Sequence, residues 1–67
     1  MNAKSLKKTF GLEIGKTYIL GNEEKVTIEG IGRNAYTKAT VLFCKSLENG
    51  KIFDASVNDA AGWRQGR

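Results

Sequence analysis

Residues 28 to 43 read IEGIGRNAYTKATVLF, and Gly30 to Ala35 within them have the spacing Gly-x-Gly-x-x-Ala. A dinucleotide-binding turn has this spacing, but it needs a helix directly after the glycines, so that the pyrophosphate meets the helix N-terminus. Here residues 36–41 follow, and their β-branched and aromatic side chains favour a strand. We therefore predict that Gly30 and Gly32 form a bulge and a tight bend between two strands.

Other short segments also have strand character, with β-rich composition or alternation of apolar and polar residues. The pair Asn49-Gly50 is the strongest hairpin signal in the chain, because a type I′ turn needs positive φ at both central residues. It separates the last two of the expected strands. The four expected strands lie within residues 15–21, 25–29, 36–44 and 51–57.

The register of this last hairpin decides which side chains form the core. A two-residue Asn49-Gly50 turn divides the apolar residues between two faces, with Val41, Phe43, Leu47 and Ile52 on one and Leu42, Cys44, Phe53, Ala55 and Val57 on the other. Either both faces are covered, or a bulge or longer loop shifts the parity. We favour the shift, because a short chain does not easily cover two faces. The shifted core face would hold Ala39, Val41, Phe43, Phe53, Ala55 and Val57.

The two ends of the chain are expected to flank this β region. Residues 1–10 form a basic arm or a short helix, with Phe10 and Leu12 as its anchors, and residues 11–67 form the β domain. Near the C-terminus, one helical turn is expected to start at Asn58 or Asp59 and to stop at Gly62.

Four or five short antiparallel strands in a chain of this length predict a mainly β fold, a small and strongly curved barrel. The patterns are Leu12-x-x-Gly15-x-x-Tyr18, Val26-x-Ile28-x-Gly30-Ile31, Ala39-Thr40-Val41-x-Phe43, Asn49-Gly50 and Phe53-x-Ala55-x-Val57. With these patterns, residues 12–63 resemble an SH3-like barrel of the KOW or Tudor type. The resemblance implies binding of RNA, DNA, ribosomal or polymerase surfaces, or peptides. The chain lacks the clustered aromatic residues of a methyl-lysine-reading Tudor cage.

The net charge of +4 is carried by the two ends of the chain. Between Gly11 and Gly62, six basic residues face seven acidic ones, so the body is nearly neutral. Basic ends on a neutral body suit a polyanionic partner, although they also serve solubility alone. The terminal cations are Lys4, Lys7, Lys8, Arg64 and Arg67.

The chemical inventory argues against catalysis. The chain has no histidine and a single cysteine, so we expect no structural zinc, no hydrolytic triad, no cofactor and no enzymatic activity. Cys44 lies in an apolar strand and is expected to be buried. The longest apolar run, residues 41–44, is too short to span a membrane, and a cytoplasmic protein without a signal peptide is expected.

The remaining cluster of interest is Arg33, Asn34, Tyr36 and Lys38, where an aromatic ring lies among cations. Such a group suits nucleic acid, because the ring stacks on a base while the cations meet phosphates. Tyr36 and Lys38 would share one face of the third strand, and Trp63 either seals the core or stacks on a ligand. The sequence favours a non-enzymatic module that binds DNA or RNA. The expected binding residues are Lys4, Lys7, Lys8, Arg33, Tyr36, Lys38, Arg64 and Arg67.

An alternative is a protein-binding inhibitor or adaptor that docks on a larger enzyme. Small barrels with neutral bodies look like accessory proteins of phages or mobile elements, which act in this way. The position of Glu23, Glu24 and Glu29 discriminates between the two functions, because carboxylates on the same face as Tyr36 would repel phosphate.

Overall fold

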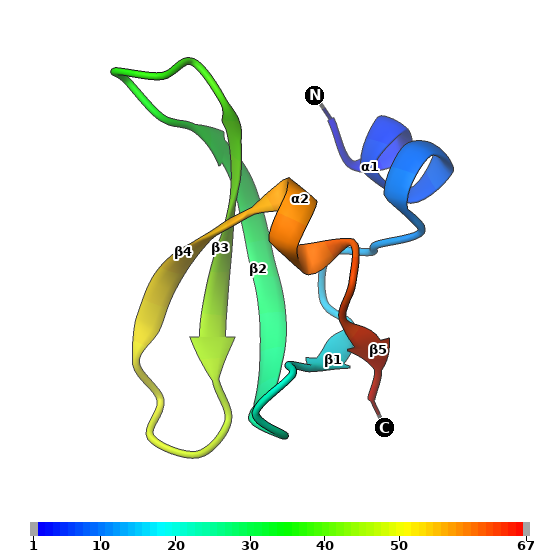
Figure 1. Cartoon of the computed structure of the whole chain (residues 1–67), viewed down its shortest axis with the longest axis vertical. Helices are drawn as coiled ribbons and strands as arrows, with labels where there is room; N and C mark the ends of the chain where they lie inside the picture. Colours follow the sequence, from blue (N-terminus) through cyan, green and yellow to red (C-terminus); the bar gives the residue numbers. More distant parts are fainter. Residues whose placement is uncertain (1, 67) are drawn as a thin grey trace.

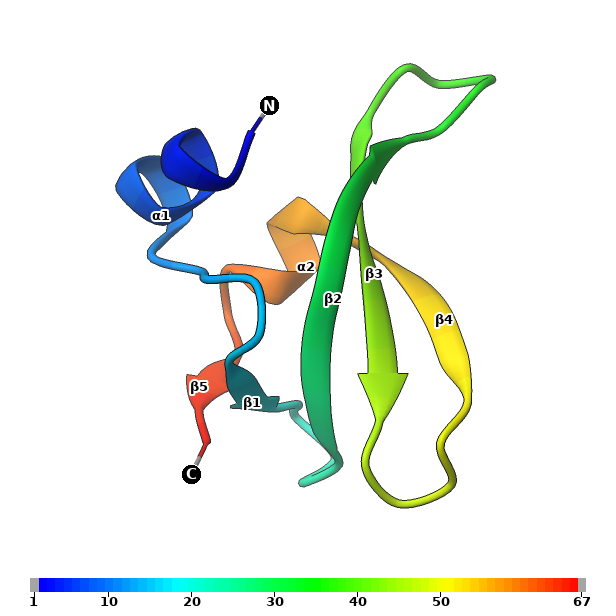
Figure 2. The same cartoon turned by 180° about the vertical axis from the view of Figure 1, so that it is seen from behind.

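The computed structural model describes residues 2–66, which form two short helices and five strands. Neighbouring strands are antiparallel in the order β4-β3-β2-β1-β5, which confirms the expected mainly β fold. The described sheet is strongly curved and open, with β4 and β5 as its edges, and the short strands β1 and β5 turn across the long ones (Figures 1 and 2). The bounds are α1 Ala3–Phe10, β1 Thr17–Ile19, β2 Lys25–Arg33, β3 Thr40–Ser46, β4 Ile52–Ser56, α2 Val57–Ala60 and β5 Arg64–Gln65.

The glycines of the opening stretch lie inside β2. In the β2–β3 ladder, Ile28 pairs with Cys44 and Gly30 pairs with Phe43, so Glu29 is an extra residue in β2. A bulge is therefore present, but it lies at Glu29 within β2 and not between two strands. The expected bend at the glycines is wrong, because β2 continues through both of them to its end at residue 33.

The bulge changes which side chains of β2 face the core. Ile28 is fully buried and Ile31, three residues later, also packs against the core. Gly30 and Gly32 then fall on the opposite face, where the ring of Phe43 lies over the β2 backbone. A Cβ atom on Gly32 would lie 2.5 Å from Cε2 and Cζ of this ring, whereas one on Gly30 would lie 3.7 Å from Cδ2. Glycine at position 32 thus allows a close approach that any side chain would prevent.

The turn between β2 and β3 occupies residues that were expected to begin the third strand. The Asn34 side-chain oxygen accepts hydrogen bonds from the backbone N–H groups of Tyr36 (2.8 Å) and Thr37 (3.0 Å). This local capping competes with strand pairing, so β3 begins only at Thr40. Tyr36 and Lys38 therefore lie in the turn, and the prediction that they share a strand face is wrong.

The turn between β3 and β4 is longer than the expected type I′ turn. Gly50 has a φ of 72°, but Asn49 does not have a positive φ. The loop spans residues 47–50 and is closed by the Ser46 N–H, which donates to the Lys51 carbonyl oxygen at 2.9 Å. Two additional loop residues leave the parity of a two-residue turn unchanged, so the favoured core face is wrong.

Neither of the two alternatives holds for this hairpin, because the parity is not shifted and one of its two faces is left uncovered. Leu42 and Cys44 are fully buried, and they pair with Ala55 and Phe53. Figures 1 and 2 show both helices, β1 and β5 on one side of the long strands, with no element covering the other side, which we call the outer face. The outer face carries Thr27, Gly30, Gly32, Val41, Phe43, Lys45, Ile52, Asp54 and Ser56.

Helix α1 is the ordered form of the basic N-terminal segment. The Asn2 side chain caps it by accepting from the Ser5 N–H at 2.9 Å, and Gly11 ends it in the left-handed conformation. Leu6 is fully buried in the common core, with Leu12, and Phe10 packs against that core. The segment is thus docked on the sheet through Leu6 in addition to the two expected anchors.

Helix α2 follows β4 without a gap and leads the chain to β5. Its N-cap is Ser56, whose Oγ accepts from the Asn58 N–H at 3.2 Å, so the expected caps Asn58 and Asp59 lie inside the helix. Val57 and Ala60 are buried, and Trp63, just after the helix, packs against the same core. The sequence left two roles open for Trp63, sealing the core or stacking on a ligand. The structure shows it packed against the core.

We expect Gly32→Ala to destabilise the fold by about 0.5–1.5 kcal/mol, because the new methyl group displaces the partly exposed Phe43 ring from its position on the β2 backbone. Gly30→Ala is the matched control and should change the stability much less. Equilibrium unfolding in urea measures both. In a Phe43→Ala background the cost of Gly32→Ala should disappear, and a cost that persists there would contradict the contact.

We also expect Leu6→Ala to destabilise the whole domain by about 2–4 kcal/mol, because Leu6 is fully buried in the shared core. Lys8→Ala changes an exposed residue of the same helix and should stay within about 0.5 kcal/mol of the unchanged protein. Thermal unfolding followed by circular dichroism measures both. If the two variants melt alike, α1 does not contribute to the core.

Candidate nucleic-acid interface

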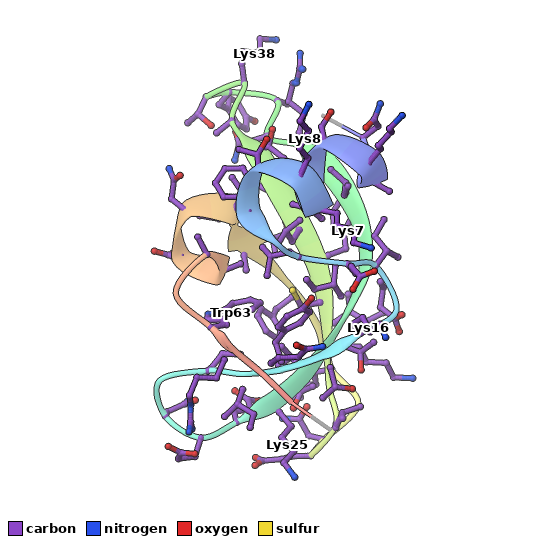
Figure 3. The ribbon with its side chains drawn as sticks, turned by 90° about the vertical axis from the view of Figure 1, so that its right-hand side faces the viewer. Lys7, Lys8, Lys16, Lys25, Lys38 and Trp63 are labelled. Atoms are coloured by element: carbon purple, nitrogen blue, oxygen red, sulfur yellow. The ribbon has the colours of Figure 1, made fainter. Side chains whose placement is uncertain are left out.

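Two segments that are distant in the sequence bring cations to one end of the molecule. Helix α1 and the β2–β3 turn both lie in the upper part of Figure 1, and Figure 3 shows Lys8 and Lys38 near that end. Residues 2–12 of the first segment and residues 30–40, which end β2 and form the turn, contain no acidic residue. We call this region the basic end, and its exposed cations are Lys4, Lys7, Lys8, Arg33 and Lys38.

The lysines of α1 differ in their pairing. The Lys7 Nζ lies 3.3 Å from Oε1 of Glu13. In the part of the chain that the structure describes, neither Lys4 nor Lys8 has an ion-pair partner. Lys7 and Lys8 lie in the last turn of the helix, where positive charge is favourable to the helix dipole. Helix α1, which is docked on the core, therefore carries two ammonium groups, those of Lys4 and Lys8, without an ion-pair partner in the described chain.

The β2–β3 turn holds an aromatic ring in full contact with solvent. Tyr36 is 95% exposed, the highest value among the large hydrophobic residues of residues 2–66. The two hydrogen bonds to Asn34 fix the turn beneath it, and the Asn34 N–H also donates to the Ala39 carbonyl oxygen at 2.9 Å. Arg33 and Lys38 flank the ring along the chain. The structure thus keeps the predicted Arg33-Tyr36-Lys38 group together, on a turn.

Arg64 is not part of the basic end. Arg64 lies on β5, in the lower part of Figure 1, and its Nη2 is 2.6 Å from Oε2 of Glu23. Arg67 lies outside the described residues, and no geometry is assigned to it. Of the cations expected at the two chain ends, the structure therefore places Lys4, Lys7 and Lys8 in the half of the molecule that holds the Tyr36 turn, and Arg64 in the other.

The nearest cluster of carboxylates lies at the opposite end of β2. Glu23 and Glu24 precede the strand, whereas Arg33 ends it, and a strand of nine residues spans roughly 26 Å. Glu24 also forms a hydrogen bond within the fold: its Oε2 accepts from Oγ of the buried Ser46 at 2.7 Å. Glu29 sits between these ends, at the bulge. The two carboxylates of the turn are thus about a strand length away from Tyr36.

A hollow of about 290 Å³ lies beside α1. It is lined by Ala3, Lys4, Lys7, Glu13 and Ile14. Its polar groups are two amines and one carboxylate, and the carboxylate is paired with Lys7. This arrangement extends the cationic surface of α1.

The thiol of Cys44 is part of the core. Burial, and to a smaller extent the negative charge of Asp54, raise the pKa of the Cys44 thiol to about 11. The thiol is therefore protonated at neutral pH, which makes it a weak nucleophile, and its expected burial is confirmed. Within residues 2–66, the structure gathers no three His, Cys, Asp or Glu side chains as a metal ion would require.

The sequence interpretation missed the apolar character of the outer face. Phe43 is 38% exposed, Leu47 54% and Ile52 68%, although all three were candidates for one side of a covered hairpin. Their alternation with Leu42 and Cys44 signals two apolar faces, but the loop length that decides between them is not encoded in the alternation. These three residues are the main exposed apolar surface besides Tyr36 and Ile14 in the described chain.

No protein-family model, curated protein or solved structure matched this chain. The described helices, of eight and four residues, are both too short to cross a bilayer.

Proposed function

We propose that this chain is a small non-enzymatic module that binds nucleic acid, DNA or RNA, through its basic end. The observation that carries the proposal is the separation of charge along β2. The cations of α1 and of the β2–β3 turn both lie in the upper half of Figure 1, on elements that stand apart from each other, whereas Glu23 and Glu24 precede β2 at its other end. The repulsion that carboxylates near Tyr36 would cause is thus reduced.

The basic end suits the phosphate backbone more than a single anion. Its cations are spread over two elements, and four of them have no ion-pair partner in the described chain: Lys4, Lys8, Arg33 and Lys38. Each cation that neutralises a phosphate releases condensed counterions, which drives binding at low salt. Because Leu6 docks α1 on the core, the backbone that carries its lysines is ordered before binding, and less backbone freedom is lost.

A second candidate function, binding to a larger protein as an inhibitor or adaptor, is favoured by the outer face. Phe43 and Ile52 expose apolar surface there, Leu47 exposes more in the adjoining β3–β4 loop, and exposed apolar patches mark protein interaction sites. The cations of the basic end do not contribute to this face. The two functions therefore depend on different residues and are separable by substitution.

The test is a salt titration of binding to generic DNA and RNA, with two matched double variants. Lys4→Gln with Lys8→Gln removes two charges from the basic end, and Lys25→Gln with Lys51→Gln removes two exposed charges from the other end of β2 and its neighbouring loop. The first should lower the slope of log K against log salt by roughly 1.4 for single strands, at about 0.7 per contact, and the second should leave it nearly unchanged.

Equal slopes for both double variants would show that net charge alone causes binding and would contradict an interface at the basic end. No binding of the unchanged protein at low salt would overturn nucleic-acid binding altogether. Protein partners would then be captured with the unchanged chain and with Ile52→Ser. A partner that Ile52→Ser loses would establish the second function, and a partner retained by both would exclude the outer face as its contact.

A further inference from the structure

The chain forms the same kind of turn twice, once at each end of β3. In the β2–β3 turn, the Lys38 N–H donates to the Asn34 carbonyl oxygen at 2.9 Å, and in the β3–β4 turn the Gly50 N–H donates to that of Ser46 at 2.9 Å. In both turns, the fifth residue has a left-handed backbone, with φ of 63° at Lys38 and 72° at Gly50. The two turns are therefore matched in backbone geometry and differ in side chains.

At the fifth position the first turn has lysine, although glycine is the more stable residue in this backbone conformation. Glycine adopts the left-handed conformation without a steric penalty, whereas a residue with a Cβ atom is strained there. Glu23 is the other such residue in residues 2–66, and its side chain is engaged with Arg64. The Lys38 side chain is exposed and has no ion-pair partner in that range. Its strain is thus not offset by an ion pair within the described chain, which points to a role in binding.

The third position of the first turn carries the exposed ring. Tyr36 occupies it, whereas Glu48 occupies the same position of the second turn. At 95% exposure, the ring adds almost no buried surface to the fold. Because the Asn34 side chain fixes the backbone on both sides of it, the ring is presented on a preorganised support.

We infer that the β2–β3 turn binds unpaired bases, so that the preferred ligand is single-stranded nucleic acid. The Tyr36 ring stacks on the face of one base, and Lys38 and Arg33 contact the phosphates on either side of it. A base inside a duplex has both faces covered by its neighbours, so a single ring at the tip of a turn stacks on it only after it has been unstacked. This inference rests on the proposed function and adds the class of ligand and the element that selects it.

The probes are an oligothymidylate of about 12 nucleotides, within the usual site size, and its duplex with oligoadenylate. Tyr36→Ala should weaken single-strand binding by roughly 5- to 150-fold, which corresponds to one stacked base, and leave the salt slope and duplex binding nearly unchanged. Tyr36→Phe retains the ring and should retain the affinity. Glu48→Ala is the matched control at the third position of the other turn, and it should not weaken binding.

Lys38→Gly separates stability from binding. Removal of the strained residue should raise the melting temperature by roughly 2–8 °C, although glycine also gains freedom in the unfolded chain. The lost phosphate contact should weaken single-strand binding by roughly 5- to 10-fold near 0.05 M salt and lower the salt slope by about 0.7. A variant that is more stable and binds more weakly with a smaller slope is the expected result, because a purely structural role of Lys38 moves neither the affinity nor the slope.

The outcomes distinguish this inference from the function on which it rests. If the unchanged protein binds neither probe at low salt, both are wrong. If it binds through the lysines of α1 but Tyr36→Ala binds single strands normally, or duplex is preferred, the proposed function remains and the base-binding turn is overturned. Unchanged affinity and slope of Lys38→Gly would likewise remove Lys38 from the ligand contact and overturn its assigned role.

Discussion

The β-bulge at Glu29 is the constraint on which the rest of the sheet depends. Ile28 and Ile31 are three residues apart, so strict alternation along a strand would send them to opposite faces. One extra residue resets the alternation, and both then face the core, opposite Cys44 and Leu42. The same reset turns Gly30 and Gly32 outward, where the missing side chains allow Phe43 to lie on the β2 backbone. A single insertion thus completes the core and explains the glycine spacing.

The length of β2 follows from this arrangement and sets the charge distribution. Because β2 runs through both glycines to Arg33, the segments at its two ends are separated by the full strand. The β1–β2 turn, with Glu23 and Glu24, lies at one end and the Tyr36 turn at the other. Had the chain bent at the glycines, the bulge carboxylate of Glu29 would lie close to the Tyr36 turn. The electrostatic basis of the proposed function therefore depends on the backbone geometry of β2.

The strand content was predictable from the sequence because alternation and β-branched residues report directly on half-buried strands. The turns were predicted less well. Strand propensity at residues 36–38 does not reveal that the Asn34 side chain captures the N–H groups of Tyr36 and Thr37. The Asn49-Gly50 pair signals a turn but does not fix its length, which depends on the pairing of Ser46 with Lys51. Both errors concern hydrogen bonds that local composition does not determine.

The candidate site was likewise predictable only in part. Arg33, Tyr36 and Lys38 are close in the sequence, so their grouping was predictable. The addition of the α1 lysines and the separation of Arg64 were not, because they depend on where Leu6 docks the helix and on the pairing of β5 with β1. Such tertiary placement comes from the shared core and is not visible in the charge pattern of the termini.

The two turns that flank β3 show how a small domain distributes stability and binding. The β3–β4 turn places glycine at the left-handed position, and the adjoining Ser46 is buried and bonded to Glu24. The β2–β3 turn has the same backbone but a strained lysine and an exposed tyrosine, neither of which adds to the core. Strain of this kind costs on the order of 1 kcal/mol, a considerable fraction of the stability of so short a chain. It is tolerable here because the bulged β2–β3 pair, with Leu42, Cys44 and Ile28 fully buried beneath it, holds the base of the turn.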